Sequence, residues 1–295
     1  MSKIAPLVTI VVPSFNHDNY LEKCINSIVN QTYNNFELIV IDDGSKDRSR
    51  EILIQLREKY NFELVFQENL GLANTLNRGF KELAKGKYLT FCASDDYWLP
   101  EKLQKQVEYM ESNPEYGMVY GKALMVDTDN NILEVETNSN NSELRGGNIF
   151  KDLILLNFHP PVNYLFRADV LKEMGYYRPD IWAEDFDMNL RIALKYPIGF
   201  INEFISAYMV SDSQTLSTKY LTFKTVNSHL NSINLFKESP FYKEAITQWH
   251  YRCFKAYCGR KRTKAFAFKC MIKSINQFYK LEFLNSFVVL FLKWK

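Results

Sequence analysis

The strongest constraint on the fold of this 295-residue chain is an alternation of short apolar runs and helical stretches in its first hundred residues. Four runs have the β-branched or aromatic character of buried strands: Leu7–Val12, Phe36–Ile41, Phe62–Phe66 and Tyr88–Cys92. Three segments between them have helical spacing of apolar residues: 20–29, 52–56 and 70–84. Such repeats predict an α/β fold with a mainly parallel sheet covered by helices on both faces.

Acidic pairs follow two of these strands. Asp42 and Asp43 come after the second strand, and Asp95 and Asp96 after the fourth, at the sheet edge where ligands gather. One carboxylate there can accept hydrogen bonds from a base or a ribose, and a pair can bind a divalent cation that in turn binds a diphosphate. The alternative is that both pairs are turn residues or helix caps, which Asp also favours.

Several function classes are excluded by missing motifs. The first strand runs into Pro13-Ser14-Phe15-Asn16 without the glycines of a dinucleotide-binding loop, and no P-loop motif occurs. The five cysteines form no CxxC pair, so neither a zinc site nor a disulfide framework is indicated. The apolar stretch at the N-terminus is too short for a signal peptide, and no run of 18 apolar residues occurs, which favours a cytoplasmic protein.

Charge divides the chain into two regions. Residues 1–218 contain 21 Lys or Arg against 31 Asp or Glu, and residues 219–295 contain 15 against 3. The basic region ends in Ser286–Lys295, where six consecutive apolar residues precede Lys-Trp-Lys, a pattern typical of a helix in a membrane interface. We therefore expect contact with an anionic membrane surface; the alternative is a helical cap docked on the acidic region. Nucleic acid is not an expected partner, because no known binding module accompanies the charge.

Three blocks of the sequence carry a family resemblance. PSFNHDNYLEKCINSIVNQTYNNFELIVIDDGSKDRS, then NLGLANTLNRGFKELAKGKYLTF followed by SDDYWLPEKL, and finally EDFDMNLRIA occur in order between residues 13 and 193. Together they resemble the family 2 glycosyltransferases, inverting enzymes with a GT-A fold. The resemblance implies a nucleotide-binding half at 1–100, an acceptor half at 101–218 and a helical extension at 219–295.

The resemblance also implies roles for the residues near the donor. Pro13, Ser14 and Phe15 would line the nucleotide base, Asp43 would contact the uracil or ribose, and Asn77 would lie close to the nucleotide.

The family's DxD motif and catalytic base are matched as well. Asp95 and Asp96 stand at that motif, where Mn²⁺ or Mg²⁺ and the diphosphate bind, and Asp185 matches the base that deprotonates the acceptor hydroxyl. Two positions depart from the pattern: Ala93 replaces the first acid of the motif, and Ser211 stands where relatives often carry a histidine.

Three further residues are candidates for the acceptor side. Trp182 is placed to stack on a sugar ring, although packing explains such a residue equally well. His159 precedes two prolines, and a turn histidine without a catalytic role is the favoured interpretation. Glu184 beside Asp185 suggests the hypothesis that like-charge repulsion raises the pKa of the base.

The leading interpretation is a transferase that moves a sugar from a nucleotide-sugar, with UDP expected, to a hydroxyl of a glycan or lipid-linked oligosaccharide. Polysaccharide, O-antigen or capsule synthesis at the inner face of the cell membrane is the expected setting. One alternative is a catalytically silent scaffold of the same fold that binds nucleotide-sugar or glycan. Another is a nucleotidyltransferase, which the absence of a Gly-rich phosphate loop disfavours.

Overall fold

A mixed eight-stranded sheet forms the centre of the computed structural model, which describes residues 5–129, 131–133, 144–210 and 222–292. Its strands are β1 (Val8–Ser14), β2 (Phe36–Asp42), β3 (Glu63–Phe66), β4 (Tyr88–Phe91), β5 (Tyr97–Trp98), β6 (Met118–Val126), β7 (Leu165–Arg167) and β8 (Ile198–Met209). The helices that accompany this sheet are α1 (Leu21–Val29), α2 (Ser49–Tyr60), α3 (Leu72–Arg78), α4 (Lys102–Ser112), α5 (Phe150–Ile154), α6 (Ala168–Glu173) and α7 (Glu184–Lys195).

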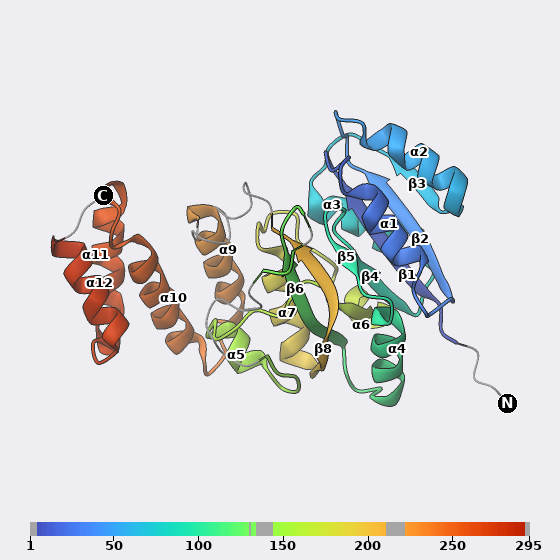
Figure 1. The fold of residues 1–295 in the computed structure, drawn as a ribbon. Coiled ribbons are helices and arrows are strands. Elements are labelled where there is room, and N and C mark those ends of the chain that lie inside the picture. Colours follow the sequence, from blue (N-terminus) through green and yellow to red (C-terminus); the bar gives the residue numbers. More distant parts are fainter. Residues whose placement is uncertain (1–4, 130, 134–143, 211–221, 293–295) are drawn as a thin grey trace.

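The strand order is β3-β2-β1-β4-β7-β6-β8-β5 (Figure 1). The four strands predicted in the first hundred residues are all present, and they pair in parallel. Strand β7 then runs antiparallel between β4 and β6, and β5 is antiparallel to β8. Strand β7 begins at Leu165, and just before it the Asn163 side chain accepts from Gly121 N and donates to the Gly121 carbonyl. The long strand β8 was not anticipated.

Two apolar cores cover the two faces of the sheet, as the alternation along β1 requires. Val11 faces the core shared with α3, α5 and α7. Val8, Ile10 and Val12 face the other core, shared with α1, α2 and α4. The parallel part of the sheet is thus buried on both sides, which leaves its carboxyl edge as the open rim.

The helix predicted at 70–84 changes its winding halfway. Helix α3 ends at Arg78, and a π-helical turn (Gly79–Leu83) continues it. Gly79 lies against β1: a Cβ at this position would come within 2.7 Å of the Val11 side chain. The glycine therefore allows the helix to lie directly on the strand beneath it.

The C-terminal helices extend the molecule away from the sheet on the side of α7 (Figure 1). They are α9 (Phe223–Ile233), α10 (Tyr242–Tyr257), α11 (Lys264–Lys273) and α12 (Leu281–Leu292), joined by short 3₁₀ turns. This confirms the prediction of helical structure for the described residues 222–292. Helix α9 is bonded to the start of α7 through Ser228 Oγ, which accepts from Ala183 N at 2.8 Å.

Some predictions fall outside the described residues: they concern Ser211, the boundary between 218 and 219, and the last three residues. Within the part that is described, no helix has the length and apolar character needed to cross a bilayer.

Candidate active site

The loop after β2 begins with two aspartates in different surroundings. Asp42 is fully buried and its Oδ1 pairs with Arg50 Nε at 2.9 Å, a role inside the fold. Asp43 accepts hydrogen bonds from the backbone nitrogens of Leu70 and Gly71 at 2.8 and 2.9 Å. Its carboxylate therefore fixes the segment that leads into α3. The contact of Asp43 with a uracil or ribose stays a prediction.

The three residues at the end of β1 lie beside that loop. Pro13 and Ser14 are buried, and the Ser14 carbonyl accepts a hydrogen bond from Asp43 N at 2.8 Å. Phe15 is 42% exposed, so part of its ring remains open to a flat ligand. This arrangement brings together the candidate base-binding residues, whose role also stays a prediction.

The second acidic pair follows β4, and its two members face different neighbours. Asp95 Oδ2 lies 3.9 Å from His17 Nε2, and the Asp95 side chain is 11% exposed. Asp96 Oδ1 accepts a hydrogen bond from Met209 N, at the end of β8, at 3.0 Å. Burial, together with repulsion from Asp95, raises the pKa of Asp96 well above the usual range. An ionised Asp96 is therefore costly here unless a positive charge lies close to it.

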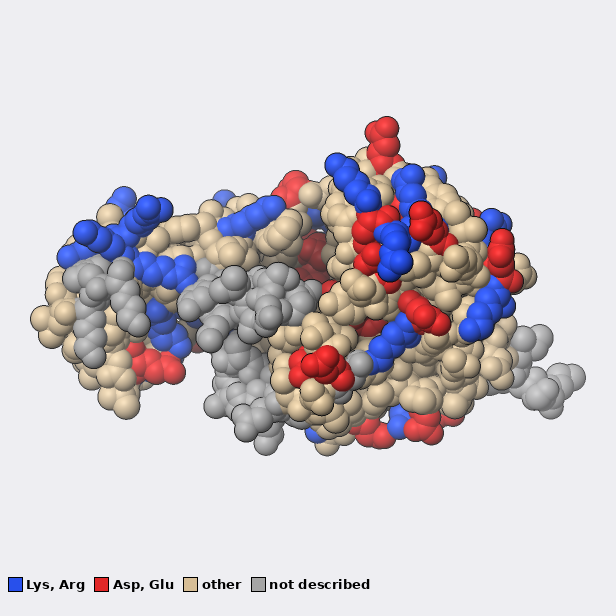
Figure 2. Space-filling model, turned by 45° about the horizontal axis from the view of Figure 1, so that its top comes forward, with Lys and Arg blue, Asp and Glu red and all other residues tan. Residues whose placement is uncertain are grey.

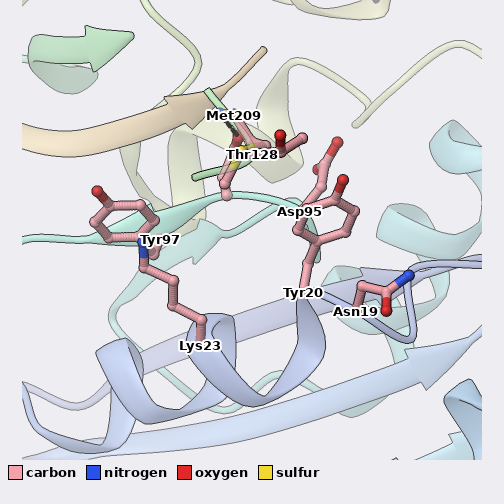
Figure 3. Close-up of a pocket in the computed structure, with 8 residues that line it drawn as sticks. Asn19, Tyr20, Lys23, Asp95, Tyr97, Thr128 and Met209 are labelled. Atoms are coloured by element: carbon pink, nitrogen blue, oxygen red, sulfur yellow. Dashed lines mark hydrogen bonds between the residues drawn. The ribbon is translucent and has the colours of Figure 1, made fainter. Parts of the chain in front are cut away.

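A cavity of about 280 Å³ opens beside this pair (Figure 3). Tyr20, just before α1, and Lys23 of α1 line it together with Asp95, Tyr97 and Met209. The Lys23 ammonium lies over the Tyr97 ring, 3.5 Å from its centroid. This space is continuous with the acidic pair but lies on the α1 side of it.

A divalent cation fits this pair only if the two carboxylates share it with other ligands, such as phosphate oxygens and water. Among the described residues, no three His, Cys, Asp or Glu side chains gather as a metal site. Asp95 and Asp96 offer two carboxylates, and a Mg²⁺ or Mn²⁺ held by one or two carboxylates takes its other ligands from phosphate oxygens and water. The raised pKa of Asp96 is consistent with this: the site favours an added positive charge.

A larger cavity, of about 620 Å³, connects the acidic pair to α7. Asp96 lines it from the end of β4, and Glu184 and Asp185 line it from the first turn of α7. Ala93, the departure from the DxD pattern, contributes only a methyl group to this wall. The structure thus brings the predicted metal-binding and catalytic carboxylates to one space, although they are about ninety residues apart in the chain.

The two acids of α7 have raised pKa values for different reasons. Burial raises the pKa of Asp185, which two backbone hydrogen bonds partly offset. Burial and then repulsion from Asp185 raise the pKa of Glu184 to about 8. Below a pH of about 8, Glu184 is therefore mostly protonated and adds little negative charge beside Asp185. The hypothesis that Glu184 raises the pKa of the base is not supported, since the repulsion acts on Glu184.

The other two acceptor-side candidates line the same cavity. Trp182 is 57% exposed, and Lys224 Nζ lies 3.3 Å from the centroid of its ring, so one face of the indole is already covered. His159 stacks on His229 with ring centroids 5.4 Å apart and lies 5.5 Å from the Phe186 ring. His159 is therefore a wall residue of the cavity, and its part in the reaction stays a prediction.

Asn77 points away from open space. Its side-chain nitrogen donates to the Tyr177 carbonyl at 2.8 Å, and its side-chain oxygen accepts from Tyr177 N at 2.9 Å. This two-way clamp joins α3 to the segment before α7 and leaves the amide little capacity for a ligand. Contact with a nucleotide stays a prediction for Asn77, and its observed bonds are structural.

Replacing Asn77 is consequently expected to destabilise the fold. Asn77→Ala leaves a buried N–H and a buried C=O of Tyr177 unpaired, at a cost of about 1–3 kcal/mol for each. Denaturant unfolding should therefore show a free energy of unfolding lower by about 2–6 kcal/mol. Asn74→Ala in the same helix, which removes only an exposed bond to Leu70, is the matched control. Equal losses in the two variants would contradict the clamp.

Sequence reasoning missed the contribution of the C-terminal helices to this cavity. Thr225 and His229 of α9 and Arg252 of α10 line it, next to the start of α7, where the Phe186 ring packs on His229. No local motif marks these residues. Their position depends on how α9 and α10 pack, which the sequence pattern does not encode.

The family assignment was tested against known proteins. The model of the family described as glycosyl transferase family 2 matches residues 9–175. An uncharacterised glycosyltransferase of Methanocaldococcus jannaschii is 27% identical, over 80% of this chain and 84% of that protein. One of Haemophilus influenzae is 35% identical, over 57% of this chain and 73% of its own length.

Solved structures agree in fold. The fragment TarS 1-349 of S. aureus in complex with UDP-GlcNAc superimposes with a TM-score of 0.62 at 18% identity, covering 95% of this chain and 79% of that fragment. The mannosyltransferase PcManGT from Pyrobaculum calidifontis, in complex with GDP-Man and Mn²⁺, gives 0.65 at 16%, covering 97% and 85%. The predicted GT-A architecture is thereby confirmed. The chain belongs to glycosyl transferase family 2 and is a glycosyltransferase.

Proposed function

We propose that this glycosyltransferase moves a sugar from a nucleotide-sugar to an acceptor hydroxyl by a single inverting displacement with Asp185 as the base. The observation that carries the proposal is the shared cavity, which Asp96 and Asp185 both line. Structural neighbours bound to UDP-GlcNAc and to GDP-Man support a nucleotide-sugar as donor.

Asp185 would act on the acceptor. A sugar hydroxyl is a poor nucleophile, and a positioned carboxylate that accepts its proton contributes about 10²–10⁴-fold to the rate. Burial raises the pKa of Asp185, which makes it a stronger base than an exposed aspartate once it is ionised. Helix α7 begins at Glu184, so the carboxylate lies on a rigid first turn rather than on a loop.

Asp95 and Asp96 would hold a divalent cation on the donor's diphosphate. When bound, such a cation neutralises the charge that develops on the leaving nucleoside diphosphate. Phe15, Pro13 and Ser14 would hold the base at the neighbouring loop, with Asp43 shaping that loop and reaching the uracil or ribose. UDP is the proposed nucleotide.

The acceptor proposed is a glycan or lipid-linked oligosaccharide used in polysaccharide, O-antigen or capsule-type synthesis. The surface of the C-terminal region, rather than the cavity, supports this choice of acceptor.

The proposed units of the chain are 1–100 for nucleotide binding, 101–218 for acceptor binding and 219–295 for the helical extension.

Nucleotide-dependent unfolding tests the donor. The melting temperature of the full chain is measured with UDP, GDP, dTDP and CMP, each with and without Mn²⁺. A ligand at 100 times its Kd adds about 2.7 kcal/mol to the free energy of unfolding. We expect the largest upward shift for UDP with Mn²⁺. A shift with another nucleotide would change the donor, and no shift with any of them would contradict nucleotide-sugar transfer.

The C-terminal helices present an apolar surface with many cations around it. Between 259 and 292 the chain has seven Lys or Arg against one acid, Glu282. Large apolar side chains there are 42–75% exposed: Phe268, Ile272, Ile275, Phe278, Leu281, Leu284, Phe287, Val288, Phe291 and Leu292. Figure 2 shows the Lys and Arg side chains gathered at this end of the molecule. Apolar area plus basic charge is the composition of a surface that binds anionic lipid, so we propose peripheral attachment to the inner face of the cell membrane.

Vesicle sedimentation tests the attachment. The full chain is expected to co-sediment with vesicles containing phosphatidylserine and not with vesicles of phosphatidylcholine alone. Each cation near an anionic surface contributes about 1 kcal/mol, so a variant with Lys261, Arg262, Lys264 and Lys269 all changed to Gln should lose most binding. Equivalent changes at Lys81 and Lys85, far from these helices, serve as the control. Equal sedimentation with both vesicle types would contradict an electrostatic membrane surface.

A further inference from the structure

The large cavity has a cationic side that the proposed reaction does not use. Glu184 and Asp185 line it from α7, whereas Arg252 lines it from α10. The Arg252 charge lowers the pKa of His159 and His229, its neighbours on this side. Acidic residues from α7 and a cation from α10 therefore line one space.

The Arg252 guanidinium is largely removed from water but uses few of its hydrogen-bond donors. Burial lowers its pKa, and one of its nitrogens, Nη1, donates to the Leu156 carbonyl. Within the described ranges this is the hydrogen bond that Arg252 makes, and no carboxylate lies within ion-pair distance of it. Arg191 differs, because its guanidinium has partners for all three nitrogens: it pairs with Asp187 at 2.8 Å and also donates to two backbone carbonyls.

His229 stands beside Arg252 with its ring directed at the same cavity. The residue is 8% exposed, and its ring packs against Phe186 and His159 with centroids 4.6 and 5.4 Å apart. In the part of the chain that is described, the ring nitrogens make no hydrogen bond. Burial and the Arg252 charge lower the pKa of His229 to about 3, so it is a neutral imidazole with one N–H to donate.

We propose that Arg252 and His229 form an oxyanion subsite for the acceptor, which would carry a phosphate or carboxylate group near the hydroxyl that Asp185 activates. This rests on the proposed function. A largely desolvated guanidinium without a counter-charge is costly, and a carboxylate or phosphate that accepts two parallel N–H bonds removes that cost. The N–H groups of Arg252 that have no partner among the described residues are the donors such an anion needs. Asp185 lines the same cavity, so acceptor binding and proton removal would take place in one space.

Anion binding to the full chain tests the subsite directly. Calorimetry is performed with saturating UDP and Mg²⁺, which occupy the donor site, and with glucose 6-phosphate, glucuronate or glucose as probe. Charge-assisted bonds to a desolvated guanidinium should make one of the anionic probes bind roughly ten- to a hundred-fold more tightly than glucose. The probe that gains identifies the anion as phosphate or carboxylate.

Three variants then separate the subsite from the surrounding fold. Arg252→Gln should lose that advantage, Arg252→Lys should keep part of it because it retains the charge but not the fork, and His229→Gln should weaken it. Arg262→Gln, an exposed arginine outside the cavity, removes the same charge and should change nothing. Unliganded melting temperatures show whether each variant is folded, and Arg252→Lys remains informative if Arg252→Gln is not.

Two results would overturn the subsite. One is equal binding of glucose and both anions by the unmodified protein, and the other is full retention of the anionic advantage in Arg252→Lys and Arg252→Gln alike. A protein that binds UDP but no anionic probe refutes the subsite and leaves the proposed function standing. A protein that binds no nucleotide refutes the proposed function itself.

Discussion

Asp185→Asn is expected to lower the rate of sugar transfer by about 10²–10⁴-fold while leaving the donor bound. Asparagine keeps the size and position of the side chain but cannot accept the proton of the acceptor hydroxyl. The measurement is release of nucleoside diphosphate in the presence of acceptor, with donor affinity followed separately by calorimetry. A variant that retains most of its rate would show that another group removes the proton.

Glu184→Gln is the matched control, because it removes the neighbouring carboxyl from the same helical turn. Asp185 works only when ionised, so activity falls as the pH drops through its pKa, which burial raises above the ordinary value. Glu184 has a pKa of about 8, so it is mostly protonated at pH values below 8. Glutamine imitates this protonated form. The acidic limb of the pH profile should therefore be unchanged in Glu184→Gln. A shift of that limb would mean that Glu184 does tune the base.

The double variant Asp95→Ala/Asp96→Ala is expected to abolish the metal-dependent response to nucleotide. The unmodified protein should gain about 2.7 kcal/mol with nucleotide and Mn²⁺ at 100 times Kd, and the variant should gain almost none of it. Without ligand, we expect the double variant to be more stable than the unmodified protein at neutral pH. The folded protein raises the pKa of Asp96, so stability is lost as the pH rises from the ordinary value through the raised one. Removing Asp96 should then raise the melting temperature at neutral pH.

Thermal unfolding measures both effects in one experiment: the stabilisation by nucleotide and Mn²⁺, and the melting temperature without ligand. Asp129→Ala, which removes an exposed carboxylate from a turn, is the control and should behave as the unmodified protein does. A double variant that still responds to nucleotide and Mn²⁺ would place the cation elsewhere.

The parts of the fold that follow from local pattern could be predicted. Val8, Ile10 and Val12 face one core while Val11 faces the other, and this two-sided burial is what an unbroken β-branched run indicates. The acidic residues after β2 and β4 could be placed at one rim for the same reason, because parallel strands end at the same edge.

The rest depends on contacts between distant segments. Asn77 is bonded to Tyr177 a hundred residues later, and nothing near either residue signals that clamp. Asp43 was expected to contact the uracil or ribose, and that contact stays a prediction; its bond to the backbone before α3 could not be foreseen from the sequence. Arg252 reaches the cavity only because α9 docks on α7 and α10 packs against α9. Sequence patterning locates elements and edges, while the partners of single polar side chains depend on the tertiary packing.

The most direct test of the account is to follow the sugar released when the enzyme hydrolyses an α-linked nucleotide-sugar, using water in place of the acceptor. Proton NMR in the first minutes distinguishes the anomers before they equilibrate. The account predicts metal-dependent release with the β anomer appearing first, and loss of that release in Asp185→Asn. Initial release of the α anomer, or an unchanged rate in Asp185→Asn, would contradict a single displacement with Asp185 as its base.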